Sequence, residues 1–263
     1  MKVIVTAGHT KSIHTICLIH QLLANGHEVL GVVIVNTFQI SRLRNYLRQY
    51  GIKTVVEKFK SHFLHKENSK LSKETKYINE YRSHLQIKEK NLIKFSKRKN
   101  INVIQVPNLN NEKAIIKAKL LNPDIIIYSG GGILRKELIN TSRYSVLNAH
   151  SGPLPEVRGM NCIEWSLMLG IAPTTSIHLI DVGIDTGSIL YKEIIPFKKN
   201  DDLYDIRGKA TVHNVELLIK VLNSFEDFYQ NKTIQKKSEG KQYFTMHDNL
   251  KEIINQKLLN EYR

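Results

Sequence analysis

The sequence predicts an α/β fold with a mostly parallel sheet and helices on both faces. A β-branched run at 3–6 is followed by apolar residues at helical spacing, and a second apolar run begins at residue 29. A strand, a helix and a strand in this order form a βαβ unit, which joins parallel strands. A third run, at 125–127, consists of isoleucines and is typical of a central strand covered on both faces.

The first unit has clear boundaries. Its strand, KVIVTAG, ends in small residues, the following helix carries Ile13, Ile16 and Leu23 on one side, and Asn25-Gly26 ends that helix. The later elements are expected in chain order: helix 40–51, one or two long basic amphipathic helices within 58–100, strand 101–110, helix 111–122, strand 123–134, helix 135–140, strand 144–152, helix 159–170, two strands within 174–197 and helix 201–225. We therefore expect a catalytic domain over residues 1–225 with a basic insertion at 58–100. A short C-terminal extension, 226–263, should contain a small hairpin or turn and a last helix.

Composition indicates a folded protein with an excess of positive charge. The formal net charge is +15, which would suit a polyanionic partner. Much of the excess lies between Lys58 and Lys99, and the Ile, Lys and Asn richness elsewhere is typical of a compositional bias. We expect the basic helices to be a solvated face, with contact to an anionic partner as the alternative.

Cysteine usage and hydropathy indicate a cytoplasmic protein without a metal site. Cys17 and Cys162 stand in no metal-ligand or disulfide pattern. The first apolar run is too short for a signal peptide, and no stretch approaches the roughly 18 apolar residues of a membrane span. We expect no bound metal and no membrane contact.

Polar and glycine-rich segments follow several of the predicted strands. In open parallel sheets, ligands bind beyond the carboxyl ends of the strands, so these segments should converge on one crevice. The segments are Ala7 to Thr10, Gly130 to Gly132, Asn148 to Gly152 and Asp181 to Gly187.

Three side chains in these segments could carry carbonyl chemistry. His150 can accept and return a proton near neutral pH, and Asn148, on the same side of an extended segment, offers an amide donor to a developing oxyanion. Asp185 could orient His150 or a water molecule. The chain has no nucleophile-elbow pattern, so direct transfer to an incoming nucleophile is favoured over a covalent acyl-enzyme.

Each feature also has a structural interpretation. An Asn-x-His segment can serve a turn, a triple glycine is usually a flexible turn, and DVGIDTG could be a hairpin loop. His178, in a strand, is equally compatible with the edge of the core or the wall of a site. TAGHT is no dinucleotide fingerprint, but Gly8, His9 and Thr10 could hold a substrate anion at the start of the following helix.

The motifs taken together resemble the folate-dependent formyltransferase family. NAHSGPLPEVRG, a helix, and then TTSIHLIDVGIDTGSIL carry the resemblance, which covers residues 1 to about 222. It implies a Rossmann-like sheet, transfer of a formyl group from 10-formyltetrahydrofolate to an amine, and catalytic roles for Asn148, His150 and Asp185. It also implies that two loops line the pterin pocket, mostly through backbone groups: Gly130, Gly131, Gly132, Ile133 and Leu134 in one, and Asp181, Val182, Gly183 and Ile184 in the other.

The amine is predicted from smaller differences within the resemblance. RGMNCIEW is similar to the Arg-Gly-x-Asn motif of enzymes acting on nucleotide-linked amino sugars for surface polysaccharides such as lipopolysaccharide O-antigen. Arg158 and Gly159 should start a helix beside the substrate, with Asn161 and His178 also in contact. About 40 residues follow the last long helix, which is too few for the barrel domain of methionyl-tRNA enzymes.

Several alternatives stay open at this stage. The amine could instead belong to methionyl-tRNA or glycinamide ribonucleotide, or the chain could be a non-catalytic module that binds RNA through residues 58–100. We expect a small-molecule substrate rather than nucleic acid, and a homodimer stays open.

Overall fold

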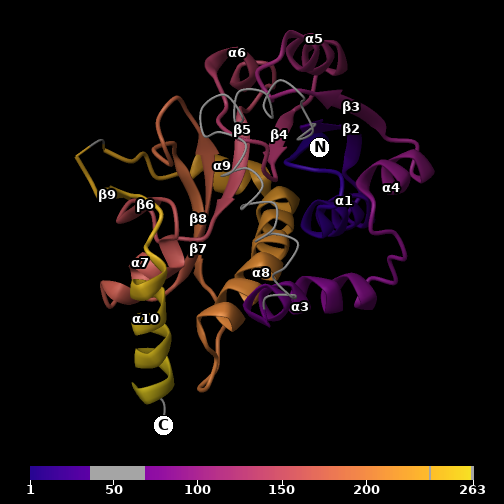
Figure 1. Ribbon diagram of the computed structural model, residues 1–263. Coiled ribbons are helices and arrows are strands. Elements are labelled where there is room, and N and C mark those ends of the chain that lie inside the picture. Colours follow the sequence, from indigo (N-terminus) through magenta and orange to yellow (C-terminus); the bar gives the residue numbers. More distant parts are fainter. Residues whose placement is uncertain (36–68, 237, 262–263) are drawn as a thin grey trace, which may run out of the picture.

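The computed structural model describes residues 1–35, 69–236 and 238–261, and its centre is a seven-stranded sheet (Figure 1). The strand order is β3-β2-β1-β4-β5-β7-β8. The first five of these strands run parallel, whereas β7 is antiparallel to both β5 and β8. The predicted α/β class is therefore confirmed. The strands are β1 (Lys2–Ala7), β2 (Glu28–Val35), β3 (Asn102–Val106), β4 (Ile125–Tyr128), β5 (Val146–His150), β7 (Thr174–Ile180) and β8 (Ile189–Ile194).

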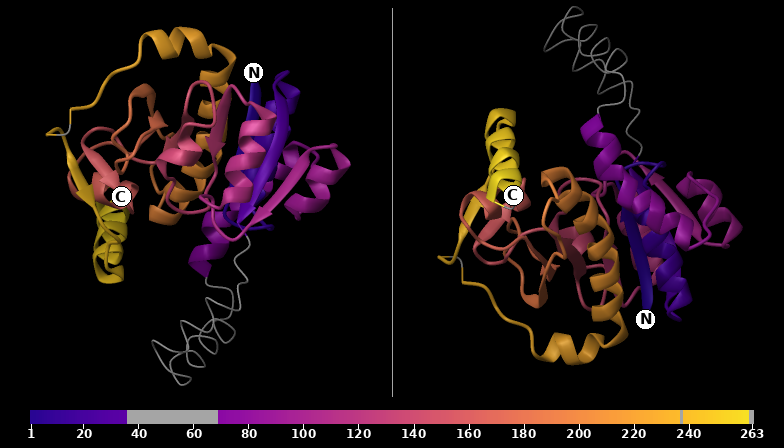
Figure 2. Two further views of the ribbon diagram at one scale, coloured as in Figure 1. Left: turned by 90° about the horizontal axis from the view of Figure 1, so that it is seen from above. Right: turned by 90° about the horizontal axis from the view of Figure 1, so that it is seen from below.

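Helices cover both faces of the sheet, as the views in Figures 1 and 2 show. One buried cluster joins the sheet to α1 (Ile13–Ala24), α3 (Ser69–His84), α4 (Leu92–Arg98), α8 (Leu203–Asn223) and α9 (Phe225–Gln230). A second cluster joins the other face to α5 (Glu112–Leu121) and α6 (Lys136–Ile139). None of the helices in the described ranges is long and apolar enough to cross a lipid bilayer.

Local capping explains where the principal helices begin and end. Ser12 accepts a hydrogen bond from the Thr15 amide at the start of α1, and Gly26 follows the helix with a φ of 77°. Asp202 and Asp205 form a reciprocal capping box at the start of α8. The predicted helix over 201–225 thus begins at a capping box formed by its own first residues.

The predicted basic insertion is described only in part. Helix 40–51 and residues 58–68 lie outside the described residues, while 69–100 contains α3, α4 and the turn between them. Several cations here meet carboxylates of the same chain: Lys73 lies 2.6 Å from Asp202 and 2.7 Å from Asp205. The exposed pair Lys76–Glu80 adds a third ion pair on α3.

The C-terminal extension differs from the expected hairpin. Its strand β9 (Lys241–Tyr243) pairs in parallel with β6 (Val157–Gly159), a strand 84 residues earlier in the chain. The predicted last helix is present as α10 (Asp248–Glu261), which packs on α7 (Cys162–Met168) in a third buried cluster (Figure 1). Arg158 and Gly159 therefore belong to β6, and the next helix starts only at Cys162. The division into two domains stays a prediction.

Candidate active site

The candidate site lies on one face of the sheet and extends across three neighbouring strands. Tyr128 on β4 is paired with Asn148 on β5, which is paired in turn with His178 on β7. Residues directly opposite each other in a sheet project from the same face, and His150, two residues after Asn148, does so too. The sheet thus places an amide and two imidazoles together.

The hydrogen bonds of His178 fix its protonation. Its Nδ1 lies 2.9 Å from the Leu179 carbonyl, which can only accept, so Nδ1 is the donor. Its Nε2, 3.0 Å from Asn148 Nδ2, then accepts from the amide. Burial, followed by the nearby His150, lowers the pKa of His178 to about 4. A neutral His178 therefore holds the Asn148 amide nitrogen in place through one of the two N–H groups on that nitrogen.

His150 and Asp185 form the second half of the cluster. His150 Nε2 donates to the Val157 carbonyl at 3.0 Å, which leaves Nδ1 facing Asp185 Oδ2 at 3.5 Å. Because an unprotonated Nδ1 and a carboxylate are both acceptors, this gap can hold one proton on either group. Asp185 Oδ1 lies 3.6 Å from His178 Nε2. The structure thus brings the three predicted catalytic residues together.

Asp185 reaches the cluster by an unexpected route. Because β7 is antiparallel to β5, its carboxyl end, Ile180, is paired with Val146 at the start of β5. We call residues 181–188 the Asp loop. Because it starts at the far end of β7 from His150, the loop must turn back along the sheet to bring Asp185 to His150. The prediction that this loop follows the same end of the sheet as His150 is wrong, although the predicted convergence occurs.

Tight local geometry makes that return possible. Asp185 adopts a left-handed φ of 53°, and a side chain at Gly187 would collide with the Leu179 carbonyl oxygen, only 1.9 Å from an added Cβ. Asp181 Oδ1 accepts hydrogen bonds from the Gly183 amide and the Thr186 hydroxyl. Asp181 thus shapes the loop through its side chain.

The two predicted cofactor loops expose apolar side chains and backbone. Gly130, Gly131 and Gly132 all have positive φ, between 99° and 122°. Ile133 is 74% exposed, and across the Asp loop Val182 and Ile184 are 80% and 41% exposed. Leu134 instead packs in the buried cluster with α6, so its side chain is not exposed at this loop.

The other predicted substrate residues take different positions. Gly8 packs against Gly131, His9 Nδ1 accepts from the Lys11 amide, and the Thr10 carbonyl accepts from Leu92 of α4. Arg158 is 5% exposed, and its guanidinium contacts Gln235 of the C-terminal extension. Gly159 donates its amide to Asp185 Oδ2 at 2.9 Å. The sequence predicted that Arg158 contacts the substrate, whereas in the structure its side chain is directed at Gln235.

A cavity of about 230 Å³ opens beside His150, and most of its charged groups were missed by sequence reasoning. Arg207 of α8 lies 3.0 Å from Glu74 of α3 and 2.5 Å from the buried Glu164 of α7. Asn161, which was predicted here, donates to Glu164 at 3.0 Å. These charges come from three separate helices, so no short motif could have indicated them.

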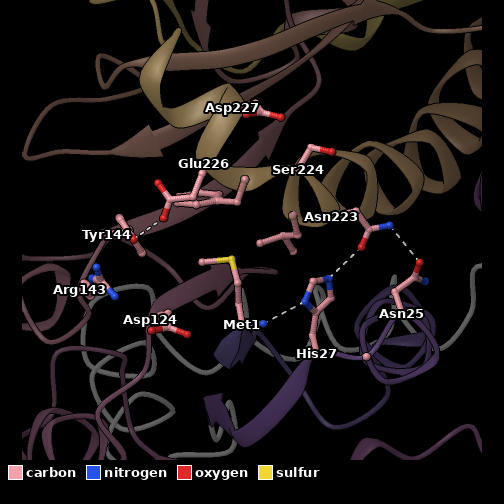
Figure 3. Close-up of a pocket in the computed structure, with 13 residues that line it drawn as sticks. Met1, Asn25, His27, Asp124, Arg143, Tyr144, Asn223, Ser224, Glu226 and Asp227 are labelled. Atoms are coloured by element: carbon pink, nitrogen blue, oxygen red, sulfur yellow. Dashed lines mark hydrogen bonds between the residues drawn. The ribbon is translucent and has the colours of Figure 1, made fainter.

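A larger cavity, of about 640 Å³, lies near the amino ends of the central strands β1, β4 and β5. Figure 3 shows its lining residues. Several of its polar groups bond to one another: His27 bridges the Met1 amino group and Asn223, and Tyr144 donates to Glu226. In open parallel sheets, ligands bind at the carboxyl ends of the strands, and this cavity lies at their amino ends. We therefore place the function at the cluster around His150.

The fold fits the formyl transferase family. The chain belongs to this family, because the model of the Formyl transferase family matches residues 1–222. Over 169 residues the chain is 32% identical to the methionyl-tRNA formyltransferase of Clostridium tetani, covering 62% of this chain and 54% of that protein. The chain thus spans about half the length of the curated relatives it matches.

Solved structures share the fold. The N-formyltransferase from Helicobacter canadensis, in complex with folinic acid and dTDP-3-aminofucose, aligns with a TM-score of 0.57 at 16% identity, covering 100% of this chain and 82% of that one. A glycinamide ribonucleotide transformylase from Symbiobacterium toebii aligns with a TM-score of 0.56 at 13% identity, covering 86% and 88%.

Proposed function

We propose that this chain transfers the formyl group of 10-formyltetrahydrofolate to the amino group of a nucleotide-activated amino sugar. The observation that carries the proposal is the cluster of Asn148, His178, Asp185 and His150, joined at 3.0–3.6 Å beside a cavity. The family match supports the reaction class.

The two cofactor loops fit a pterin. A flat heteroaromatic ring needs apolar contacts on its faces and hydrogen-bonding groups along its edge. Ile133, Val182 and Ile184 offer exposed apolar side chains, and the extended turn Gly130–Gly132 leaves its backbone groups free of Cβ atoms. We propose that these residues, with the backbone of Leu134, Asp181 and Gly183, hold the pterin.

Each residue of the cluster then has a chemical role. The bound 10-formyltetrahydrofolate supplies the formyl carbon that the acceptor amine attacks. Asn148, held by His178, directs its second N–H at the formyl oxygen, where negative charge develops. The proton lost by the amine passes to the His150–Asp185 pair and returns to the leaving nitrogen of the folate.

The cavity beside His150 suits an acceptor with a protonated amine. Its three charged groups, Glu74, Glu164 and Arg207, sum to one negative charge. A carboxylate-rich wall attracts an ammonium and, by its charge, disfavours a phosphate at the same point. The bound ammonium gives one proton to solvent, and the neutral amine that results attacks the formyl carbon. We propose that the amine end of the sugar enters here and that the nucleotide lies farther out.

Two other readings are less well supported. The match to methionyl-tRNA enzymes favours a tRNA acceptor, but it covers only 54% of such a protein. A polyanion-binding role is weakened because Lys73, Lys76 and Arg98 contact carboxylates of the same chain. We further propose a reducing, cytoplasmic setting, since Cys17 and Cys162 are free thiols in buried positions.

The decisive experiment is an acceptor panel. Purified protein is assayed with 10-formyltetrahydrofolate and a set of nucleotide-linked amino sugars, with glycinamide ribonucleotide and charged initiator tRNA as further arms. We expect turnover only with an amino sugar. Turnover only with the tRNA would refute the sugar proposal and keep the formyl transfer.

Variants of the cluster test the assigned residues. We expect His150→Ala and Asp185→Ala to lose nearly all turnover while remaining folded, because both handle the transferred proton. The matched control is His84→Ala, a histidine at the end of α3. Wild-type turnover in both cluster variants would refute the catalytic assignment, and salt-sensitive RNA binding that survives them would favour the binding-module alternative.

A further inference from the structure

We infer that Gln235, in the C-terminal extension, is a positioning residue that holds the Asp loop in its catalytic conformation. The inference rests on the proposed function, because it assigns a role to Asp185. Gln235 lies beyond residue 222, where the family match ends, so this role comes from the structure of this chain.

The side-chain amide of Gln235 uses all of its principal hydrogen-bonding groups. Its Nε2 donates to the Asp185 carbonyl at 3.0 Å and to the Gly187 carbonyl at 2.6 Å. Its Oε1 accepts from Arg158 Nε at 3.2 Å and Nη2 at 2.9 Å. Because Arg158 can only donate and the two carbonyls can only accept, the amide has one possible orientation.

Burial makes this arrangement hard to replace. Gln235 is 9% exposed and Arg158 is 5% exposed. A buried carbonyl that loses its donor cannot recover a bond to bulk water, so removing Gln235 would leave two loop carbonyls unpaired. Arg158 would keep one bond from its Nη2, to the Lys236 carbonyl at 3.3 Å. The inward turn of Arg158 is thereby explained.

The position of the contact points to catalysis rather than to general stability. Gln235 binds the backbone of Asp185 itself, whose left-handed φ of 53° is less favourable than a right-handed one for a residue with a side chain. The Asp185 carboxylate must face His150 Nδ1 for a proton to pass between them. A loop free to relax from that φ would move the carboxylate away from the imidazole.

The same extension fixes the other contacts of the pair. β6 supplies the carbonyl of Val157 to His150 and the amide of Gly159 to Asp185. β9 pairs along the whole of β6, and the Tyr243 carbonyl oxygen would be 2.1 Å from a Cβ added to Gly159. Gln235 and β9 therefore hold the Asp loop and β6 together as one frame around His150 and Asp185.

The test compares Gln235→Ala and Gln235→Glu with Gln256→Ala, an exposed glutamine of α10 in the same extension. Gln235→Glu keeps the size and the acceptor for Arg158 but removes both donors. We expect kcat to fall about 10- to 100-fold in both Gln235 variants, as for a misplacement of a catalytic group, and to stay unchanged in Gln256→Ala. Hydrogen exchange of the amides of residues 181–188 should accelerate in both Gln235 variants and not in the control.

A second background separates positioning from a structural role. In an Asp185→Asn background, Gln235→Ala should cost less than about 2-fold in kcat, because residues that act as a unit are not additive. Three results would overturn the inference. They are an equal loss of kcat in both backgrounds, wild-type turnover in the Gln235 variants, and faster hydrogen exchange along the whole chain. If Gln235→Ala does not fold, Gln235→Glu and Arg158→Lys carry the same measurements.

The exchange measurement also separates this inference from the proposed function. If the wild-type protein formylates none of the acceptors, the proposed function fails, while locally faster exchange at 181–188 would still support the role of Gln235. Unchanged exchange in the Gln235 variants would overturn that role whatever the activity.

Discussion

At the scale of single residues, the site depends on places where no side chain can be added. Gly152 follows His150 closely, and a Cβ added there would lie 2.6 Å from Cys162 Cβ and 2.7 Å from His150 Nε2. Neither neighbour can give way easily, because Cys162 Cβ is fixed to its backbone and His150 is bonded to Val157. This glycine is therefore required by the space around the imidazole.

We expect Gly152→Ala to lower kcat about 100-fold, because the His150 ring must leave its alignment with Asp185. Overpacking should also lower the free energy of unfolding by about 1–3 kcal/mol. Activity assays and denaturant unfolding measure the two effects. The control is Gly26→Ala, where no atom lies within 4 Å of an added Cβ, so only the backbone strain at its positive φ remains. Equal kcat values in the two variants would contradict this account.

At the scale of elements, α3 and α8 form a close helix pair that also lines the acceptor cavity. Gly208 of α8 allows the approach: a Cβ added there would lie 2.4 Å from Tyr77 Cδ2 and 2.7 Å from the Glu74 carbonyl oxygen. Glu74 and Arg207 meet at the same contact. The packing of α3 thus sets the position of one charged group of the cavity.

We expect Gly208→Ala to destabilise the protein, although alanine is the better helix former by roughly 1 kcal/mol. Overpacking against α3 typically costs about 1–3 kcal/mol, which exceeds that gain. Chemical denaturation measures the difference, and the loss should shrink in a Tyr77→Leu background, where part of the clash is removed. A higher denaturation midpoint for Gly208→Ala than for the wild type would contradict the prediction, because it would show that α3 can move away from the added methyl group at little cost.

The elements also show what the sequence could predict and what it could not. The strands and the helices of the described residues follow from apolar runs and caps, as at Ser12 and Asp202, which act on neighbouring residues. Asn148 and His150 were recognisable because they end a buried strand. The parallel pairing of β9 with β6 and the contact of Gln235 with Asp185 depend on the path of the chain across 50 or more residues, which local patterns do not encode.

At the scale of the whole molecule, several histidines sit in places that disfavour their charged form. Burial lowers the pKa of His14 and of His178 to about 4, and it also lowers the pKa of His20 and His27. His14 lies beneath the glycine turn after β4, 3.0 Å from Ser129 Oγ, and His178 lies in the candidate site. The fold therefore holds neutral imidazoles on both sides of the predicted ligand crevice.

This burial makes the stability of the protein sensitive to mild acid. Between pH 6.5 and about 4 the unfolded chain protonates His14 and His178 while the native state does not, so the unfolded state binds more protons and stability falls as the pH falls. Each histidine contributes at most about 1.4 kcal/mol per pH unit in this window. Lys220 and Tyr191 lower the pKa of Glu193 to about 2, and this shift affects stability only at pH values below the ordinary pKa of about 4.5.

Denaturant unfolding at pH 7.5, 6.0 and 5.0 should show the loss of stability. His14→Gln should reduce the slope of stability against pH, because one of the buried imidazoles is gone. An unchanged slope in that variant would mean that His14 titrates alike in the folded and unfolded chain.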